Sequence, residues 1–291
     1  MTGPTRSPEL TCDITYDRLI ASCGLPRLEA RALLEHCCAK SREWLVAHGD
    51  ESVPTEQAQA FIQLAARRRD RQEPLAYLLG WREFHGRAFS VSAAVLIPRP
   101  ETELLVDLAI QIAEPQARLL DLGTGSGCIA ITIACERMDL KIIATDRSPE
   151  ALAQARSNAE HLCPDRLAGN RLEFRIGDWW QSIANEERFD LIISNPPYIA
   201  AADPHLGIGD LRFEPPGALA SGDDGLDSLR TICAGAPSRL NESGTLLVEH
   251  GYDQAPAVQA LMRNAGLDAV RTVKDAAGLD RITIGTWRQS A

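Results

Sequence analysis

The sequence predicts an α/β fold in which a seven-stranded, mostly parallel, doubly wound sheet follows a small helical domain. Two observations lead to this prediction. Apolar segments rich in β-branched residues alternate with helical segments after about residue 101, whereas the chain before about residue 85 shows helical periodicity alone. Strands spaced by helices form parallel sheets covered on both faces, and such strands are apolar throughout rather than alternating.

Residues 1–85 are expected to form a small helical bundle. Apolar residues recur at positions i, i+3, i+4 and i+7 in residues 30–37 and again in residues 58–65, which is the spacing of one helix face. Glycine and proline residues at 24–26 and within 48–54 separate the helices from one another.

A short β-hairpin is expected between the two domains. The stretch from Phe89 to Ile97 places β-type residues on both sides of Ser92-Ala93-Ala94, which predicts a turn there. Residues 86–100 are therefore predicted to form the hairpin and linker, and residues 101–291 the second domain. Two domains are also the natural expectation for a chain of 291 residues.

The second domain is divided by its apolar segments and its helix breakers. Ligands of parallel sheets bind at the carboxyl ends of the strands, so residues that directly follow strands are candidates for a functional site. The expected strands are 117–122, 141–145, 171–176, 189–194, 245–249, 269–273 and 281–287, and the expected helices include 128–137, 149–160, 224–240 and 253–264.

Charge is distributed unevenly along the chain. Residues 1–100 carry 13 basic and 12 acidic side chains, whereas the remaining residues carry 17 and 28. An acidic domain repels a phosphate backbone, so stable binding of DNA is not expected. The basic cluster Arg67–Arg71 is expected to be a solvated helix end with cations at the negative pole of the helix dipole. A docking patch for an acidic or RNA-bound partner is the alternative.

The composition favours a soluble, cytoplasmic protein. No apolar run approaches the ~20 residues of a membrane helix, and residues 1–9 lack the apolar core of a signal peptide. The eight cysteines, Cys12 among them, form no Cys-x-x-Cys pair and have no nearby histidine at metal-ligand spacing. Reduced thiols, no metal site and no association with a membrane are therefore expected.

The segment 119–130 has the pattern of a strand, a glycine-rich turn and the start of a helix. The glycines of the loop Gly123–Gly127 permit positive φ and a close approach of the backbone to a ligand. Asp146 ends the next strand, 19 residues beyond Gly127, where a carboxylate can accept ribose hydroxyls. A dinucleotide fingerprint would need glycine in place of Cys128, so the spacing favours a cofactor with one nucleoside and no pyrophosphate. For the loop taken alone, a turn without a ligand is the alternative.

The turn Asn195-Pro196-Pro197-Tyr198 follows the fourth strand of this domain. Two prolines donate no N–H and fix φ near −65°, so the chain leaves the strand in a stiff, extended turn. That turn offers the Asn195 amide, backbone carbonyls and the Tyr198 ring, which together suit a planar group bearing an NH2. The alternative is a rigid turn with Tyr198 as a packing residue. Trp179, after the third strand, can lie against a nucleobase or can be a core residue.

The glycine spacing and its acid resemble those of S-adenosylmethionine-dependent methyltransferases. The Asn-Pro-Pro-Tyr turn is similar to that of the enzymes among them that methylate adenine N6, cytosine N4 or glutamine N5. The stretches 74–84, 96–106, 214–219 and 249–252 are similar to the HemK/PrmC family, and this resemblance covers about residues 15–287.

The resemblance implies a class I methyltransferase fold and a defined activity. Members of the family transfer a methyl group from S-adenosylmethionine to the side-chain amide nitrogen (N5) of the glutamine in the Gly-Gly-Gln motif of class-1 peptide chain release factors. The helical domain would dock this protein substrate. Asn195, Pro196 and Tyr198 would be catalytic, and with Pro197 they would bind the substrate amide. The residues expected to contact the cofactor are Gly123, Thr124, Gly125, Ser126, Gly127, Asp146, Trp179 and Asn195.

Two other functions are compatible with parts of this pattern. An adenine-N6 methyltransferase acting on DNA or RNA can share the Asn195–Tyr198 turn, but it needs a basic groove, and the acidic second domain argues against one. A non-catalytic binding module could retain the fold, but the loop, the acid and the turn are all present.

Overall fold

The computed structural model describes residues 14–288, so the expectations for the N-terminal stretch, including Cys12, lie outside what it describes. The chain divides into two compact units, Met1–Gly80 and Trp81–Ala291. The first unit is helical and the second contains the large sheet. The α/β class predicted from the sequence is confirmed.

The helical unit packs around an apolar core. Its helices are α1 (Tyr16–Ser22), α2 (Arg27–Cys38), α3 (Arg42–Ala47), α4 (Thr55–Arg71) and α5 (Leu75–Leu79). Leu33 and Leu34 of α2 and Phe61 of α4 are fully buried, because the helical spacing of apolar residues directs them to one side. The Thr15 and Ser41 side chains accept backbone N–H groups at the starts of α1 and α3, which caps these short helices.

The arginines at the end of α4 are paired within the helical unit. The ion pairs are Arg67–Glu73, Arg68–Glu29 and Arg69–Asp70. Ion pairs at a protein surface contribute only about 0–1 kcal/mol each. Because three cations of the cluster already have a carboxylate partner, the pairing favours a helix end neutralised by its neighbours over a docking patch.

The second unit is built on a seven-stranded sheet with the order β5-β4-β3-β6-β7-β9-β8. Strands β3 to β7 are parallel, and β9 is antiparallel to both of its neighbours. The winding reverses between β3 and β6, which is where open sheets of this kind bind ligands. The strands are β3 (Arg118–Leu122), β4 (Lys141–Asp146), β5 (Leu172–Ile176), β6 (Phe189–Ser194), β7 (Leu240–Glu249), β8 (Leu267–Lys274) and β9 (Asp280–Trp287).

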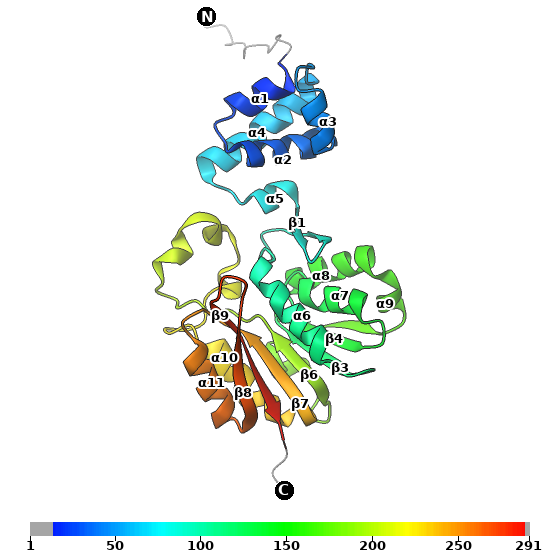
Figure 1. The fold of residues 1–291 in the computed structure, drawn as a ribbon, viewed down its shortest axis with the longest axis vertical. Helices are drawn as coiled ribbons and strands as arrows, with labels where there is room; N and C mark the ends of the chain where they lie inside the picture. Colours follow the sequence, from blue (N-terminus) through cyan, green and yellow to red (C-terminus); the bar gives the residue numbers. More distant parts are fainter. Residues whose placement is uncertain (1–13, 289–291) are drawn as a thin grey trace, which may run out of the picture. The chain divides into compact units, whose positions relative to one another are not determined.

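Helices cover both faces of this sheet (Figure 1). Helices α6 (Glu103–Ile112), α7 (Cys128–Glu136) and α8 (Pro149–Leu162) pack on one face, and the short α9 (Pro164–Ala168) follows α8. Helices α10 (Asp227–Gly235) and α11 (Ala255–Asn264) pack on the other. Successive residues of the central strand therefore enter opposite cores, Leu119 the first and Leu120 the second. Within residues 14–288, no helix has the length and apolar character needed to cross a membrane.

The helix predicted over residues 224–240 is too long. Helix α10 ends at Gly235, a 3₁₀ turn covers Ala236–Ser238, and β7 already begins at Leu240. Pro237 explains the early end, because a proline has no N–H to continue the helix and its ring clashes with the preceding turn.

The hairpin is present but lies ahead of its predicted position. Strands β1 (Trp81–Phe84) and β2 (Arg87–Ser90) pair around His85-Gly86, which have φ of 50° and 74°. Positive φ at both turn residues matches the twist of a two-residue hairpin. The predicted turn at Ser92–Ala94 is present, with the Val95 N–H donating to the Ser92 carbonyl at 3.1 Å, but residues 91–99 form a loop after β2, so this turn does not close the hairpin. The hairpin groups with the sheet unit, and the helical unit ends at Gly80.

Asn158 of α8 links the hairpin to the glycine loop. Its Oδ1 accepts the Ser90 N–H at 2.9 Å, and its Nδ2 donates to the carbonyls of Ser90 at 3.0 Å and Ser126 at 2.9 Å. The side chain is buried, so these bonds are shielded from water. One amide thus fixes β2 and the loop after β3 to the same helix.

Candidate active site

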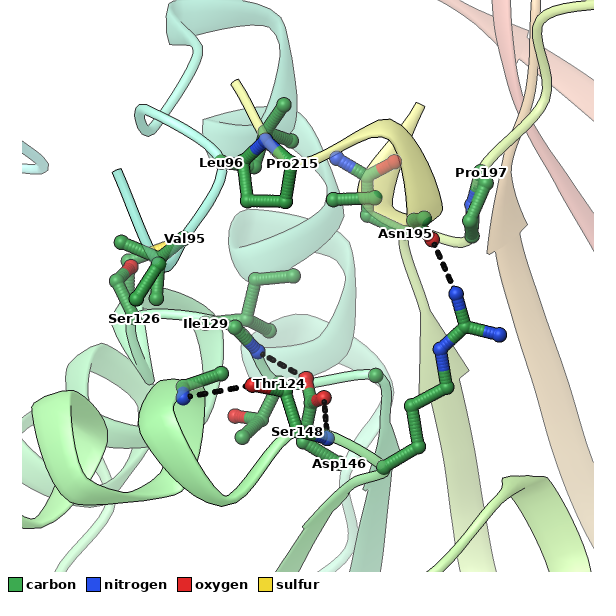
Figure 2. Close-up of a pocket in the computed structure, with 18 of the residues that line it drawn as sticks. Val95, Leu96, Thr124, Ser126, Ile129, Asp146, Ser148, Asn195, Pro197 and Pro215 are labelled. Atoms are coloured by element: carbon green, nitrogen blue, oxygen red, sulfur yellow. Dashed lines mark hydrogen bonds between the residues drawn. The ribbon is translucent and has the colours of Figure 1, made fainter. Parts of the chain in front are cut away.

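A cavity of about 370 Å³ lies at the carboxyl ends of β3, β4 and β6. Pockets that hold small ligands commonly measure ~300–1,000 Å³. Figure 2 shows Val95, Ser126 and Ile129 on one side of this cavity and Asn195 and Pro197 on the other. Of the predicted site residues, the cavity is lined by Gly123, Thr124, Gly125, Ser126, Asp146, Trp179, Asn195 and Pro197, whereas Gly127, Pro196 and Tyr198 lie outside its lining.

The glycine-rich loop joins β3 to α7 in a conformation that requires glycine. Gly123, Gly125 and Gly127 have φ of 75°, 55° and 81°. A Cβ at Gly127 would lie 2.7 Å from Ile131 Cδ1 and 3.1 Å from Ala155 Cβ, so the loop packs closely on α7 and α8. A Cβ at Gly125 would meet no atom within 4 Å. The loop is therefore packed at its end and open toward the cavity at its middle.

Asp146 lies at the end of β4, next to the glycine loop. Its Oδ2 accepts the Gly125 N–H and its Oδ1 accepts the Ser148 N–H, each at 2.9 Å (Figure 2). Each carboxylate oxygen has a further lone pair. The carboxylate is therefore held in place by the backbone and can still accept hydroxyl groups from a ligand in the cavity.

Asp121 of β3 has a buried carboxylate with an unpaired oxygen. Its Oδ2 accepts the Thr124 hydroxyl at 2.6 Å, whereas Oδ1 has no hydrogen-bond partner among residues 14–288. Burial raises the pKa of Asp121 to about 7; the Thr124 hydrogen bond lowers it and the Asp146 carboxylate raises it. A positive charge brought to this loop would stabilise the carboxylate. The site therefore fits a cofactor that carries both ribose hydroxyls and a cationic group.

The free energy of unfolding is expected to depend on pH through protonation of the Asp121 carboxyl group. Its pKa of about 7 in the folded chain lies above the value of roughly 3.9 for an unfolded aspartate. The folded state therefore binds the proton more tightly, and the stabilisation is present below about pH 4 and lost as the pH rises through about 7. Relative to wild type, Asp121→Asn should gain stability between pH 4 and 8, by up to about 4 kcal/mol. Urea unfolding of both proteins across this range measures the difference, and a difference independent of pH would contradict the assignment.

The adjacent tryptophans Trp179 and Trp180 occupy different environments. Trp179 begins the 3₁₀ turn η2 (Trp179–Ser182) with a φ of 49° and lines the cavity. A Cβ at Gly123 would lie 3.5 Å from its ring. The Trp180 Nε1–H donates to the Thr231 carbonyl of α10 at 3.0 Å. Trp179 is thus placed where a flat ligand could lie against it, and Trp180 is a packing residue.

Asn195 follows β6 and lies in the cavity wall. Its Nδ2 donates to Thr102 Oγ1 at 3.0 Å, and Thr102 is only 2% exposed. Thr102 ends the 3₁₀ turn η1 (Pro100–Thr102) that leads into α6. Within residues 14–288, no donor reaches Asn195 Oδ1. The amide therefore has a fixed orientation and a free acceptor.

The remainder of the Asn-Pro-Pro-Tyr turn is divided between the cavity and the core. Pro197 lines the cavity and Pro196 is buried. The Tyr198 hydroxyl donates to Glu249 Oε1 at 3.4 Å, and its ring packs on the core beneath α10 and α11. Burial and the Glu249 carboxylate raise the pKa of Tyr198, which keeps its hydroxyl protonated. Tyr198 thus has the position of a packing residue, and a clamp on a substrate would need its ring to face the cavity.

An ion pair joins two segments of the cavity wall. The buried Glu214 carboxylate pairs with Arg99 and accepts the Ile97 N–H at 3.1 Å. Burial raises the pKa of Glu214, and the Arg99 guanidinium opposes this effect. Figure 2 shows Leu96 and Pro215, from the two joined segments, near each other. The sequence pointed to neither Leu96 nor Val95 as wall residues, because their places in the wall depend on this long-range contact.

Glu249 and His250, at the end of β7, do not line the cavity. His250 is fully buried, with Nδ1 at 2.8 Å from the Gly251 carbonyl and Nε2 at 2.8 Å from Thr283 Oγ1. Burial lowers the pKa of His250, so the ring is neutral and both nitrogens have partners. This arrangement is structural. In the part of the chain that the structure describes, no group of three or more His, Cys, Asp or Glu side chains could hold a metal ion, and the cysteines are free thiols.

The fold and this cavity define a methyltransferase of class I. Residues 113–275 match the methyltransferase domain family. A methyltransferase from Pyrococcus furiosus shares the fold, with a TM-score of 0.53 and 18% sequence identity over 71% of this chain and 91% of that chain.

The helical unit and the full-length relatives identify the family. Residues 16–80 match the PrmC N-terminal domain. The chain is 50% identical over 269 residues to the release factor glutamine methyltransferase of Bordetella pertussis, covering 92% of this chain and 97% of that protein. It is 46% identical over 275 residues to the release factor glutamine methyltransferase of Neisseria gonorrhoeae, covering 94% and 98%. The chain belongs to the release factor glutamine methyltransferase family, which confirms the resemblance found in the sequence.

Proposed function

We propose that this chain transfers a methyl group from S-adenosylmethionine to the N5 amide nitrogen of the glutamine in the Gly-Gly-Gln motif of class-1 peptide chain release factors, in the cytoplasm. The observation that carries this proposal is the Asn195 amide, whose Nδ2 is held by Thr102 while Oδ1 is left as an acceptor at the cavity. Membership of the family supports the choice of substrate. The helical unit would dock the release factor.

The residues around the glycine loop would hold S-adenosylmethionine. Asp146 would accept the ribose hydroxyls, and Trp179 would lie against the adenine ring. The N–H groups and open surface of the loop Gly123–Gly127 would face the amino-acid part, close to the Asp121 carboxylate. When bound, this cofactor supplies an electrophilic methyl group on a sulfonium, so the protein needs no strong base of its own.

Catalysis would rest on alignment of the substrate amide. A carboxamide nitrogen is a poor nucleophile, because its lone pair is delocalised into the carbonyl group. Asn195 Oδ1 would accept one N–H of the glutamine. The Pro196 carbonyl would accept the other if the turn shifts when substrate binds, since Pro196 lies outside the cavity lining here. These bonds would fix the nitrogen and stabilise the positive charge that develops on it. Orientation alone can contribute up to ~7–11 kcal/mol in well-arranged systems. Tyr198 would cover the planar amide if its ring turns toward the cavity when substrate binds.

The decisive experiment compares acceptors. The full-length protein is incubated with radiolabelled S-adenosylmethionine and a class-1 release factor, the same factor with Gly-Gly-Gln changed to Gly-Gly-Ala, or DNA or RNA. Methyl transfer to the glutamine-bearing factor alone supports the proposal. Transfer to adenine in nucleic acid would instead identify the adenine-N6 activity, and the absence of transfer to every acceptor would favour a binding module.

Asp146→Ala is expected to weaken binding of S-adenosylmethionine by about 10- to 100-fold, because two hydrogen bonds to a carboxylate contribute about 1.5–3 kcal/mol each and part is recovered by water. Isothermal titration calorimetry measures this change. Asp190→Ala is a matched control, since Asp190 is also half-buried and accepts the backbone N–H of Arg118, outside the cavity lining. An unchanged affinity in Asp146→Ala would remove this residue as the ribose ligand.

A further inference from the structure

Thr102 is the one protein group that orients the Asn195 side chain among the described residues. It is 2% exposed, and its Oγ1 lies 3.0 Å from Asn195 Nδ2. The two residues are 93 positions apart in the chain, so the contact joins the start of α6 to the turn after β6. An asparagine side chain can present either its oxygen or its NH2 to a ligand, and the hydrogen-bond partners decide which.

The Thr102–Asn195 hydrogen bond has a defined direction, with Asn195 Nδ2 as the donor and Thr102 Oγ1 as the acceptor. A threonine hydroxyl has one hydrogen to donate and can accept with its lone pairs. The Glu249 carboxylate lies close to Thr102: burial raises the pKa of Glu249 to about 7, and the Thr102 and Tyr198 hydroxyls lower it. Glu249 Oε1 receives the Tyr198 hydroxyl at 3.4 Å, whereas Oε2 is buried without a partner in the described chain. The lone pairs of Thr102 Oγ1 therefore accept the NH2 group of Asn195, which leaves Asn195 Oδ1 for the cavity.

We propose that Thr102 is a positioning residue for amide methylation: by accepting from Asn195 Nδ2, it turns Asn195 Oδ1 to the substrate. If Thr102 donated to Asn195 instead, the NH2 group would face the cavity and would oppose the N–H of the glutamine. This proposal rests on the proposed function, because it assigns Asn195 Oδ1 to the substrate amide. It adds a role for Thr102, which also lines the cavity, that is exerted through Asn195.

The test compares three variants of the full-length protein. Thr102→Val removes the hydroxyl at almost constant volume, and Thr102→Ser keeps it. Thr132→Val is the matched control, because Thr132 is fully buried in α7 and its Oγ1 has no hydrogen-bond partner among residues 14–288. We expect Thr102→Val to lower kcat at least tenfold with KM for the release factor within about twofold. Thr102→Ser should remain within about threefold of wild type, and Thr132→Val should leave kcat unchanged.

A second measurement needs neither substrate nor cofactor. The side-chain 15N–1H2 signals of Asn195, assigned by their loss in Asn195→Ala, report the hydrogen bond to Thr102. In Thr102→Val we expect exchange of the bonded hydrogen with water to accelerate at least tenfold, with recovery in Thr102→Ser. If Thr102→Val does not fold, Thr102→Ala removes the same hydroxyl without a methyl group in its place.

The outcomes separate this proposal from the proposed function. A wild-type protein that methylates no glutamine refutes the function, while the exchange measurement still tests the orientation of Asn195. Wild-type kcat in Thr102→Val, equal losses in the valine and serine variants, or unchanged exchange at Asn195 would each overturn the role of Thr102.

Discussion

Asn195→Ala should reduce kcat for glutamine methylation by roughly 10²–10³-fold, the range found when one preorganised hydrogen-bonding group is removed from the site of developing charge. The reason is that the hydrogen bond to Thr102 fixes the Asn195 amide, so that Oδ1 is available at the cavity as an acceptor. Binding of S-adenosylmethionine should stay measurable, because the glycine loop and Asp146 are unchanged. Single-turnover kinetics with saturating release factor separate the methyl-transfer step from binding.

Asn241→Ala provides the matched control for this substitution. Asn241 lies in β7, outside the cavity lining, and its Nδ2 donates to Asp190 Oδ1 at 2.6 Å. This variant loses a comparable half-buried amide and should keep its turnover. Near-normal kcat in Asn195→Ala would remove the acceptor role. A loss of turnover in both variants would point to a general structural effect.

The features that the sequence predicted are those encoded by neighbouring residues. The glycine loop Gly123–Gly127 and the acid Asp146 each follow a strand directly, so the parallel order of β3 and β4 brings them together at one edge. The glycine spacing also indicates the class of cofactor, because Cys128 stands where a dinucleotide fingerprint needs its third glycine. The glycine spacing and the strand order lead to the same prediction here, because the loop and Asp146 lie within one βαβ unit of about 30 residues.

The features that the sequence did not predict depend on contacts between distant residues. Thr102 meets Asn195 across 93 positions, and Glu214 meets Ile97 across 117. The spacing of residues along the chain does not show which distant residues come into contact. All four residues nevertheless lie in the stretches on which the family resemblance was based. The position of Tyr198 has the same origin, since Glu249, 51 residues away, draws its hydroxyl toward the core.

The misplaced hairpin turn has a local cause. The φ of 50° at His85 is uncommon for a residue with a side chain, so His85-Gly86 is a weaker turn signal than Asn-Gly or Asp-Gly. The apolar residues used for the prediction, from Phe89 to Ile97, are indeed buried, but after Ser90 they belong to a loop. The apolar character of this segment therefore reflects burial of its side chains and not a strand.

Gly127→Ala is expected to cost more stability than any other glycine-to-alanine change in the loop. The left-handed conformation at φ of 81° costs an alanine about 1–2 kcal/mol. The new Cβ would also lie 2.7 Å from Ile131 Cδ1 and 3.1 Å from Ala155 Cβ, and such overpacking costs typically 1–3 kcal/mol. The lower entropy of the unfolded chain offsets about 0.4–1 kcal/mol. We expect a net loss of roughly 2–4 kcal/mol in urea unfolding followed by tryptophan fluorescence.

Gly125→Ala separates the two causes, because its φ of 55° is also left-handed but its Cβ would meet no atom within 4 Å. This variant should lose about 1 kcal/mol or less from the backbone term alone. Its affinity for the cofactor should still fall, since the added methyl group would project from the part of the loop that lines the cavity. Equal losses of stability in the two variants would mean that Gly127 is required for its backbone conformation and not for the close approach of the loop to α8. A larger loss of stability in Gly127→Ala than in Gly125→Ala would mean that Gly127 is required for the close packing of the loop. Gly125 would then be the glycine that leaves room for the ligand.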